Sequence, residues 1–404
     1  MNVFIAIFGL AFLVLVHEAG HFFTARLVGM RPRRFYLGFP PPLVKVNRNG
    51  IEYGIGAIPL GGYVKIPGMH RPAPSDLDVH FGQAEREVPE LLPRVEAAKR
   101  AVGRGDLDAA RAALPSLEQA VEKAKLSAGA RRPAERGLRE LADALSPDAY
   151  WRQRAWKKIA VIFAGPGTNL LLAIVIFTTI LVVATGGYRV GFVLRPHGQK
   201  ITRVVDSVLA NSPAKQIGLR PGDALIAING RTVGPLQIHG VIERSKGVPL
   251  TLTVVRHGRR VTLGPVQARK EASFSVPHAV WDSVKLTGFT ARDIGKSLVN
   301  IVHGQGRKQI ASPVGIVRAS SQAAHQGWLD YLNILGFISL SLALLNLLPL
   351  LPLDGGHIAF SIVEAIRGRA VGREVYERVS AVGLALVLLL FFIGLSNDVG
   401  GSGS

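Results

Sequence analysis

Two histidines and a glutamate near the amino terminus have the spacing of a hydrolytic metal site. Residues 17–21 read H-E-A-G-H, inside an apolar run that starts at Asn2. Residues four apart share one face of a helix, so His17 and His21 can bind one metal ion together. Glu18 is rotated from His17 by about 100° and lies beside that ion, where a general base for water is needed.

The surroundings of this H-E-x-x-H motif strengthen the metal interpretation. Ionisable side chains within an apolar helix are costly, so three of them together need a shared function. The alternative is the end of a helix at which both histidines are solvated. The chain contains no cysteine, so it has neither a thiolate nucleophile nor disulfide bonds, and a metal ion must be held by His, Asp or Glu.

Four apolar stretches in the 404-residue sequence predict a polytopic α-helical membrane protein. The first stretch lacks a basic leader and a small-x-small cleavage site, so we interpret it as a retained transmembrane helix rather than a signal peptide. Residues 400–404 contain only glycine and serine, and we interpret them as an artificial linker outside the fold. The predicted spans are residues 1–26, 158–185, 331–350 and 379–396.

The net charge of +20 would favour nucleic acid as a partner if the chain were soluble. The arginines and lysines cluster beside the apolar stretches, as the positive-inside rule requires, so the expected partner is the lipid bilayer and not nucleic acid. Basic segments follow the first span, precede the second and join the third to the fourth. These segments are therefore expected in the cytoplasm, with the amino terminus outside.

Residues 27–70 predict a small membrane-associated β-sheet. Asn49-Gly50, between two strand-like runs, is typical of a type I′ hairpin turn. The sheet is either an ordinary surface hairpin or an exposed edge that accepts an extended peptide as an added strand. Residues 71–150 then predict a cytoplasmic helical insert whose function the sequence does not reveal. Its predicted helices cover about 88–102, 106–126 and 134–145.

The second span contains a Gly-Pro-Gly sequence at 165–167, which predicts a break in the helix and allows close approach of another helix. Asn169 follows at membrane depth, either as an interhelix hydrogen bond or as part of an active site. Residues 271–330 predict a linker region with an amphipathic helix near 279–302.

The depth of the histidines points to a third metal ligand. In the predicted orientation, His17 lies roughly 23 Å from the outer start of its helix, at about 1.5 Å per residue, and therefore nearer the cytoplasmic face. The third span runs inward and brings Asp354 to that face, where two histidines and one carboxylate leave a position on zinc open for water. His357 is the rival ligand. We prefer Asp354 because a Pro-x-Asp-Gly-Gly turn can aim it back towards the helices.

Residues 189–270 are rich in predicted strands and resemble a PDZ domain of the type found in bacterial proteases. The resemblance rests on residues 214–230, which include the elements G-L-x-x-G-D and I-N-G. A PDZ domain binds an extended peptide or a chain end by strand addition, which requires an open sheet edge. The alternative is a PDZ domain that acts only as a plug or a spacer.

Four features, in this order along nearly the whole chain, resemble the site-2 protease family near the bacterial regulator of sigma-E protease type. They are the H-E-x-x-H motif, Gly-Pro-Gly-Thr-Asn at 165–169, the PDZ-like domain and the run from Asn346 to Gly355. The resemblance implies an intramembrane zinc endopeptidase of the bacterial inner membrane, with its PDZ domain outside. It implies cleavage of single-span membrane proteins, such as anti-sigma factors or signal-peptide remnants, in regulated intramembrane proteolysis.

The resemblance also implies roles for single residues. His17, His21 and Asp354 would hold zinc, and Glu18 would be the base that activates water. The sheet would receive the unwound substrate as an added strand, while the PDZ domain would filter substrates by size or access. The candidate substrate-binding residues are Asn346, Asn169, Gly61, Gly62 and Tyr63.

The chain departs from that family in two ways. The best-known relatives of this type carry two PDZ domains, whereas this chain has room for one, and the helical insert is longer than expected. Two other classes of function remain. A catalytically silent membrane scaffold that binds partners through its PDZ domain is the main alternative. A metal-ion transporter is disfavoured because the fourth span has no polar residue between Val382 and Leu395.

Overall fold

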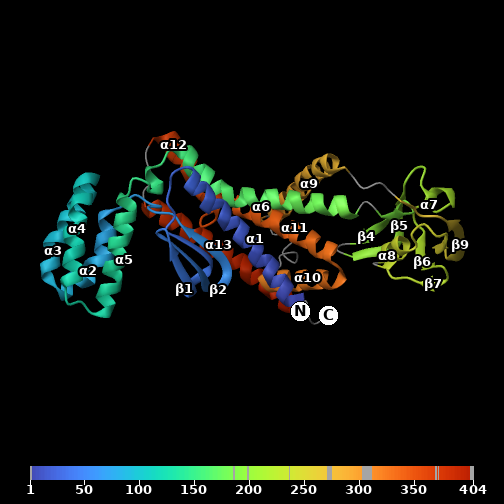
Figure 1. The fold of residues 1–404 in the computed structure, drawn as a ribbon, viewed down its shortest axis with the longest axis horizontal. Helices are drawn as coiled ribbons and strands as arrows, with labels where there is room; N and C mark the ends of the chain where they lie inside the picture. Colours follow the sequence, from blue (N-terminus) through green and yellow to red (C-terminus); the bar gives the residue numbers. More distant parts are fainter. Residues whose placement is uncertain are drawn as a thin grey trace. The chain divides into compact units, whose positions relative to one another are not determined.

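The computed structural model describes residues 2–184, 187–197, 200–235, 237–270, 275–302, 312–368, 371 and 373–400. Residues 401–404 of the predicted linker, and parts of the predicted region 271–330, lie outside these residues. The chain forms two compact units. The first unit consists of residues 1–173 and 287–404, and the second consists of residues 174–286 (Figure 1).

Among the described residues, four helices are long and apolar enough to cross a membrane, which confirms the predicted number. Their limits differ from the predicted ones, most clearly in the fourth helix, where helical hydrogen bonding continues into residues 373–378, which include Arg and Glu, good helix formers although they are not apolar. The helices are α1 (Asn2–Leu27), α6 (Ala155–Ala184), α11 (Trp328–Asn346) and α13 (Arg373–Gly400).

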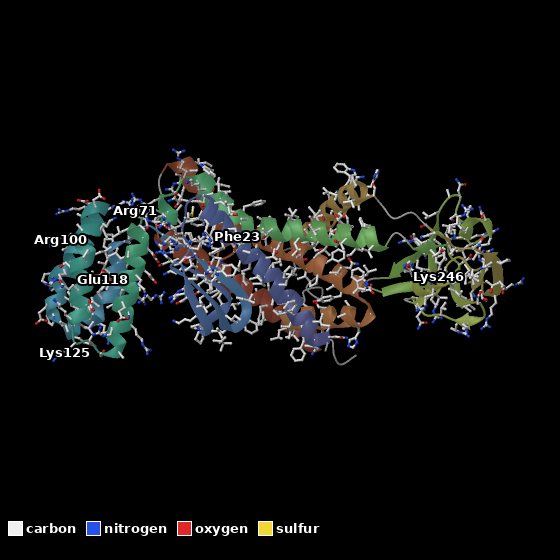
Figure 2. All side chains as sticks on the ribbon, in the orientation of Figure 1. Phe23, Arg71, Arg100, Glu118, Lys125 and Lys246 are labelled. Carbon is white, nitrogen blue, oxygen red and sulfur yellow. The ribbon has the colours of Figure 1, made fainter. Side chains whose placement is uncertain are left out.

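Large apolar side chains cover the outside of α1. Phe4 is 78% exposed and Phe8 is 76% exposed. Phe23, which is labelled in Figure 2, is 60% exposed. Soluble monomeric proteins rarely expose large apolar side chains in contiguous groups. This exposed face therefore suits the hydrocarbon interior of a bilayer.

The helix α6 runs without a break through Pro166, so the predicted break is wrong. Pro166 has no N–H to donate to the carbonyl four residues earlier, which membrane helices tolerate. Thr168 Oγ1 lies 2.8 Å from the Gly165 carbonyl oxygen and 3.1 Å from that of Val16, and it can donate to either. At Gly20 of α1, an added Cβ would lie 2.4 Å from a carbonyl oxygen of α6. Small residues thus let the two helices pack backbone against backbone.

The predicted small sheet is a hairpin of two long strands, β1 (Arg34–Arg48) and β2 (Ile51–Lys65). The two residues between them, Asn49 and Gly50, have φ angles of 52° and 76°. A type I′ turn requires positive φ at both central residues, as the Asn-Gly sequence predicts.

Both strands of this hairpin fold back within the sheet. Residues 34–37 pair with residues 52–55 and also with residues 62–65. Residues 62–65 therefore form one edge of the sheet, and no other described strand pairs with their outer side.

A helical insert lies between β2 and α6 in the sequence. The sequence prediction misses its first helix because Pro72 and Pro74 suggest a linker, whereas proline is favoured at the first position of a helix. Asp106 caps α4 by accepting a hydrogen bond of 2.9 Å from the Ala109 N–H. The helices are α2 (Pro74–Glu87), α3 (Leu92–Arg104), α4 (Leu107–Lys123) and α5 (Ala128–Leu145), with a short 3-10 helix at Pro89–Leu91. Their shared apolar core includes Leu77, Phe81, Leu91, Leu117 and Leu145.

The second unit is built on a β-sheet. In its described part, the strand order is β4-β5-β6-β8-β9, with β7 beside β6, and β3 pairs with β10. The strands are β3 (Tyr188–Arg189), β4 (Phe192–His197), β5 (Lys200–Val208), β6 (Ala224–Ile228), β7 (Arg231–Thr232), β8 (Leu250–Arg256), β9 (Arg259–Val266) and β10 (Arg269–Lys270). The short helices are α7 (Pro213–Gln216) and α8 (Gln237–Arg244).

The aspartate of the G-L-x-x-G-D element holds this unit together. Burial alone would raise the pKa of Asp223, but its hydrogen bonds with Arg256 and with the Arg220 N–H outweigh burial, so its pKa lies below the usual range. The two hydrogen bonds measure 2.7 and 2.8 Å. The charged carboxylate thus ties the loop before β6 to the end of β8.

Two further helices in the first unit are absent from the sequence prediction, which places a linker and a basic loop in these regions. They are α10 (Pro313–Gln326) and α12 (Asp354–Arg367). In the sequence, Gly355 suggests a turn. In the structure it lies in α12 and allows close packing against the preceding segment, because an added Cβ would lie 2.2 Å from the Leu348 carbonyl oxygen. The predicted amphipathic helix is α9 (Val276–Val302).

Candidate metal centre and active site

The two motif histidines meet inside the first unit, on one face of α1. His17 Nε2 and His21 Nε2 lie 3.2 Å apart, and both residues are buried. The Nδ1 atom of His21 lies 2.8 Å from the Val161 carbonyl oxygen of α6, to which only a protonated nitrogen can donate. This hydrogen bond leaves the His21 Nε2 lone pair free for a metal ion, as is usual for metal-binding histidines.

Asp354, the first residue of α12, completes the group. Its Oδ2 atom lies 3.1 Å from His17 Nε2 and 3.4 Å from His21 Nε2. The ligand atoms of the three residues all lie within 4.8 Å of one another. Asp354 Oδ2 is buried and makes no hydrogen bond with any described residue. Two imidazole nitrogens and a buried carboxylate oxygen that converge without a hydrogen bond to the carboxylate fit a zinc ion, which takes such ligands.

The expected base, Glu18, lies beneath the edge of the sheet. An added Cβ at Gly62 would lie 2.7 Å from Glu18 Cγ and 2.8 Å from the Tyr36 carbonyl oxygen. Only a glycine lets the edge residues 62–65 approach the glutamate this closely. Glu18, both histidines and Asp354 all line one cavity of about 660 Å³.

Gly165 of α6 is a site residue that the sequence prediction does not identify. An added Cβ would lie 2.2 Å from His21 Nε2 and 2.9 Å from His17 Nε2. The Gly-Pro-Gly sequence signals close helix approach, but it does not show which side chains fill the space. Here the space is filled by the Nε2 edges of both imidazoles.

Asn169 stands behind His17. The residue is fully buried, its Nδ2 atom lies 3.4 Å from His17 Nδ1, and its Oδ1 atom has no partner among the described residues. If His17 Nε2 binds a metal, Nδ1 carries the proton and needs an acceptor. The two ends of an amide are assigned from such hydrogen bonds, so Oδ1 is the end that belongs beside His17. With zinc on His17, the amide of Asn169 would orient that imidazole, and the cavity lining does not include Asn169.

Replacing Asn169 by leucine is expected to weaken zinc binding about 10- to 100-fold, the usual effect of losing a residue that orients a metal ligand. The measurement is the zinc dissociation constant from competition with a chelator. Ser339→Ala is the matched control, because Ser339 Oγ donates to the main-chain carbonyl oxygen of Asn169, at 2.8 Å. Equal zinc affinity in all three proteins would contradict the role of the amide.

The remaining predicted residues lie around the cavity in different ways. Asn346 lines it and donates from Nδ2 to the Leu342 carbonyl oxygen at 3.0 Å. Tyr63 also lines it, and its ring stacks on that of Tyr36 with centroids 5.4 Å apart. Gly61 has a φ of 147°, a value that favours glycine, and lies outside the cavity lining.

The rival ligand His357 lines the cavity but is not in the group of described residues that could hold a metal ion. Its Nδ1 atom forms a short hydrogen bond with the Tyr376 hydroxyl group. Burial lowers the pKa of His357 to about 4, although the nearby Asp354 carboxylate opposes the shift. The structure therefore gathers Asp354 with the motif histidines and leaves a neutral His357 beside them.

Comparison with known proteins agrees with this geometry. The profile of peptidase family M50 matches residues 5–390. The chain is 29% identical to a protein of Agrobacterium fabrum named "putative zinc metalloprotease", over 96% of this chain and 93% of the relative. Proteins of the same name from Neisseria meningitidis and Lactococcus lactis are 30% and 29% identical, over 97% and 98% of this chain and 97% of each relative.

The chain belongs to peptidase family M50, the site-2 proteases. It is a metalloprotease by family, and its cofactor is zinc. The family resemblance and the zinc cofactor inferred from the sequence are confirmed.

Proposed function

We propose that the chain is an intramembrane zinc endopeptidase that cleaves single-span membrane proteins, anti-sigma factors and signal-peptide remnants being candidate substrates. One observation carries this proposal. His17, His21, Asp354 and Glu18 line one cavity, between apolar helices and directly under a sheet edge. At such a site, a peptide segment that leaves the bilayer can be hydrolysed by water.

In this proposal His17, His21 and Asp354 hold the zinc ion. When bound, zinc polarises a peptide carbonyl and lowers the pKa of water towards about 7. Glu18 accepts the proton of the attacking water and passes it on to the leaving amine. Asn169 and the Val161 carbonyl oxygen keep both imidazoles in the tautomer that presents Nε2 to the site.

The sheet edge at residues 62–65 is proposed to hold the substrate. A helical substrate satisfies its backbone groups internally and must be unwound before water can attack. Unpaired backbone groups cost several kcal/mol in lipid, and strand addition supplies replacement hydrogen bonds. Pairing on the inner side with residues 34–37 fixes this edge, so that an added strand would lie next to Glu18. Asn346, in the same cavity lining, is proposed to help hold the substrate backbone.

The second unit is proposed to be a PDZ domain that binds an extended peptide or a chain end and limits access of substrates. Support comes from the element at 214–230, which runs from α7 to β6 and the turn at Asn229 and Gly230. We place the protein in the bacterial inner membrane, with this unit and the amino terminus outside and the helical insert in the cytoplasm. The basic residues that flank the spans support this orientation.

The test is cleavage of a single-span membrane protein by the purified full chain in liposomes. We expect cleavage in the presence of zinc, loss to background after chelation, and recovery on adding zinc back. Cleaved and uncleaved substrate are separated by electrophoresis, and the cut is located by mass spectrometry. A silent scaffold would leave the substrate intact in all three conditions, and that result would overturn the proposal.

A further inference from the structure

The helical insert reaches the catalytic cavity. The cavity that is lined by His17, His21, Asp354, Glu18 and the sheet edge is also lined by residues of α2 and α5. The insert thus lines the cavity in which the proposed cleavage takes place. Its cavity-lining residues include Leu77, His80, Phe81, Gly137, Glu140 and Leu141.

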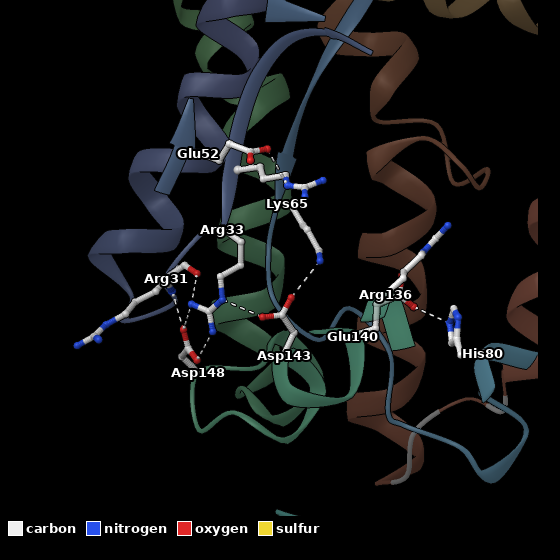
Figure 3. A network of polar contacts seen from close by, with 10 residues as sticks. Arg31, Arg33, Glu52, Lys65, His80, Arg136, Glu140, Asp143 and Asp148 are labelled. Atoms are coloured by element: carbon white, nitrogen blue, oxygen red, sulfur yellow. Dashed lines mark hydrogen bonds and ion pairs between the residues drawn. The ribbon is translucent and has the colours of Figure 1, made fainter. Parts of the chain in front are cut away.

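Charged contacts fix the insert to the sheet (Figure 3). Asp143, near the end of α5, lies 2.8 Å from Arg33 Nε and 3.1 Å from Lys65 Nζ. Asp148 accepts a hydrogen bond of 3.0 Å from the Arg31 N–H and lies 3.4 Å from Arg33 Nη1. Lys65 ends the strand that carries the sheet edge, so these contacts couple α5 to that edge.

The two connections of the insert are also bonded to each other. The Tyr150 N–H donates to the Pro67 carbonyl oxygen at 2.9 Å, and the Trp151 N–H donates to that of Gly68 at 3.0 Å. An added Cβ at Gly68 would lie 2.7 Å from the Ala149 Cβ, so the two segments are in close contact. With both ends held, the insert is a fixed wall of the cavity and not a loosely tethered domain.

The charge of this wall indicates what it can bind. Asp143 is neutralised by Arg33 and Lys65, as described above. Glu140 is different, because its side chain is 42% exposed and its contacts are a 2.7 Å pair with Arg136 and a 3.1 Å pair with His80. An exposed pair one helical turn apart contributes only a few tenths of a kcal/mol, so Glu140 can exchange Arg136 for another cation.

We propose that α2 and α5 form the second wall of the substrate channel and receive a Lys- and Arg-rich segment beside the cleaved stretch, with Glu140 as its contact. This inference rests on the proposed function. The inner flanks of membrane spans are rich in Lys and Arg, which matches a carboxylate at this wall. The sheet edge would then bind the unwound residues, while the insert binds the adjacent segment according to its charge.

A charge reversal on α5 tests this inference. The zinc-loaded full chain in liposomes is given two single-span substrates that differ only in their flank, which is rich in Lys and Arg in one and neutral in the other. KM and kcat are measured for each substrate. Glu140→Arg is expected to raise KM for the basic flank about tenfold, through charge repulsion, and to leave KM for the neutral flank and both kcat values nearly unchanged. Glu135→Arg is the matched control, because Glu135 lies on the same helix, is 44% exposed and is outside the cavity lining.

A crosslinking experiment gives a second readout. A photoreactive amino acid in place of His80, which lines the cavity, is expected to form an adduct with the basic flank in the Glu18→Gln background. The same amino acid in place of Glu118, on the exposed side of α4, is expected to form none (Figure 2). Adducts at neither or at both positions, or an equal effect of Glu140→Arg on both substrates, would overturn the role of the insert while wild-type cleavage still supports the protease. Absence of wild-type cleavage would overturn the proposed function itself, and this inference with it.

Discussion

Glu18→Gln is expected to slow peptide cleavage by at least about 100-fold and to leave zinc binding intact. Glutamine has nearly the same shape as glutamate, so the contact of this side chain with Gly62 is kept. It cannot accept the proton of the attacking water, and a positioned general base typically contributes 10²–10⁴-fold. Single-turnover cleavage in liposomes and the molar ratio of bound zinc are the two measurements.

Glu135→Gln serves as the control for this variant, since it removes an exposed carboxylate of the insert outside the cavity lining. It is expected to match the wild-type chain in both measurements. Normal turnover by Glu18→Gln would remove Glu18 from its role as the base. Loss of zinc in the same variant would instead make Glu18 part of the metal-binding group.

Gly165→Ala is expected to have the second large effect, this time on the metal. The new methyl group would lie 2.2 Å from His21 Nε2 and 2.9 Å from His17 Nε2, so both imidazoles must move. Overpacking of this kind costs about 2–3 kcal/mol, which corresponds to zinc binding weakened roughly 30- to 150-fold. Cleavage at limiting zinc should fall in parallel. Chelator competition measures the zinc dissociation constant directly.

Gly167→Ala is the matched control, two residues along the same helix. There the nearest atom to an added Cβ is Phe163 Cε1 at 3.2 Å, at the end of a side chain that can shift. Alanine favours a helix over glycine by about 1 kcal/mol, so the helix itself gains in both variants. Zinc affinity should fall only in Gly165→Ala. Equal affinity in the two variants would show that the histidines do not need the space at Gly165.

The H-E-x-x-H arrangement is predictable from sequence because its geometry is local. His17, Glu18 and His21 lie within five residues of one helix, and the helical repeat alone fixes their relation. Asp354 is more than 300 residues away, and its choice over His357 depended on a turn that is in fact the start of α12. The segment before α12 packs against the start of that helix and so positions Asp354. Sequence periodicity does not reveal such packing.

Packing of one residue against another is the part that sequence reasoning misses. In the sequence, Gly165 indicates only a flexible or small residue. The pattern does not show that two imidazoles fill the space that a side chain at this position would occupy. The insert shows the same limit. Its caps and apolar repeats predict helices, but the contacts of Asp143 with Arg33 and Lys65 join residues far apart in sequence and appear only in the fold.

The contact between Gly62 and Glu18 has a consequence for the engineering of selectivity. The strand that would bind the peptide packs, at Gly62, directly against Glu18, the proposed base for hydrolysis. Swapping side chains along that strand to accept new peptides will therefore disturb turnover as well as affinity. Altered preference is easier to obtain from α5, which lines the same cavity but is not part of that strand.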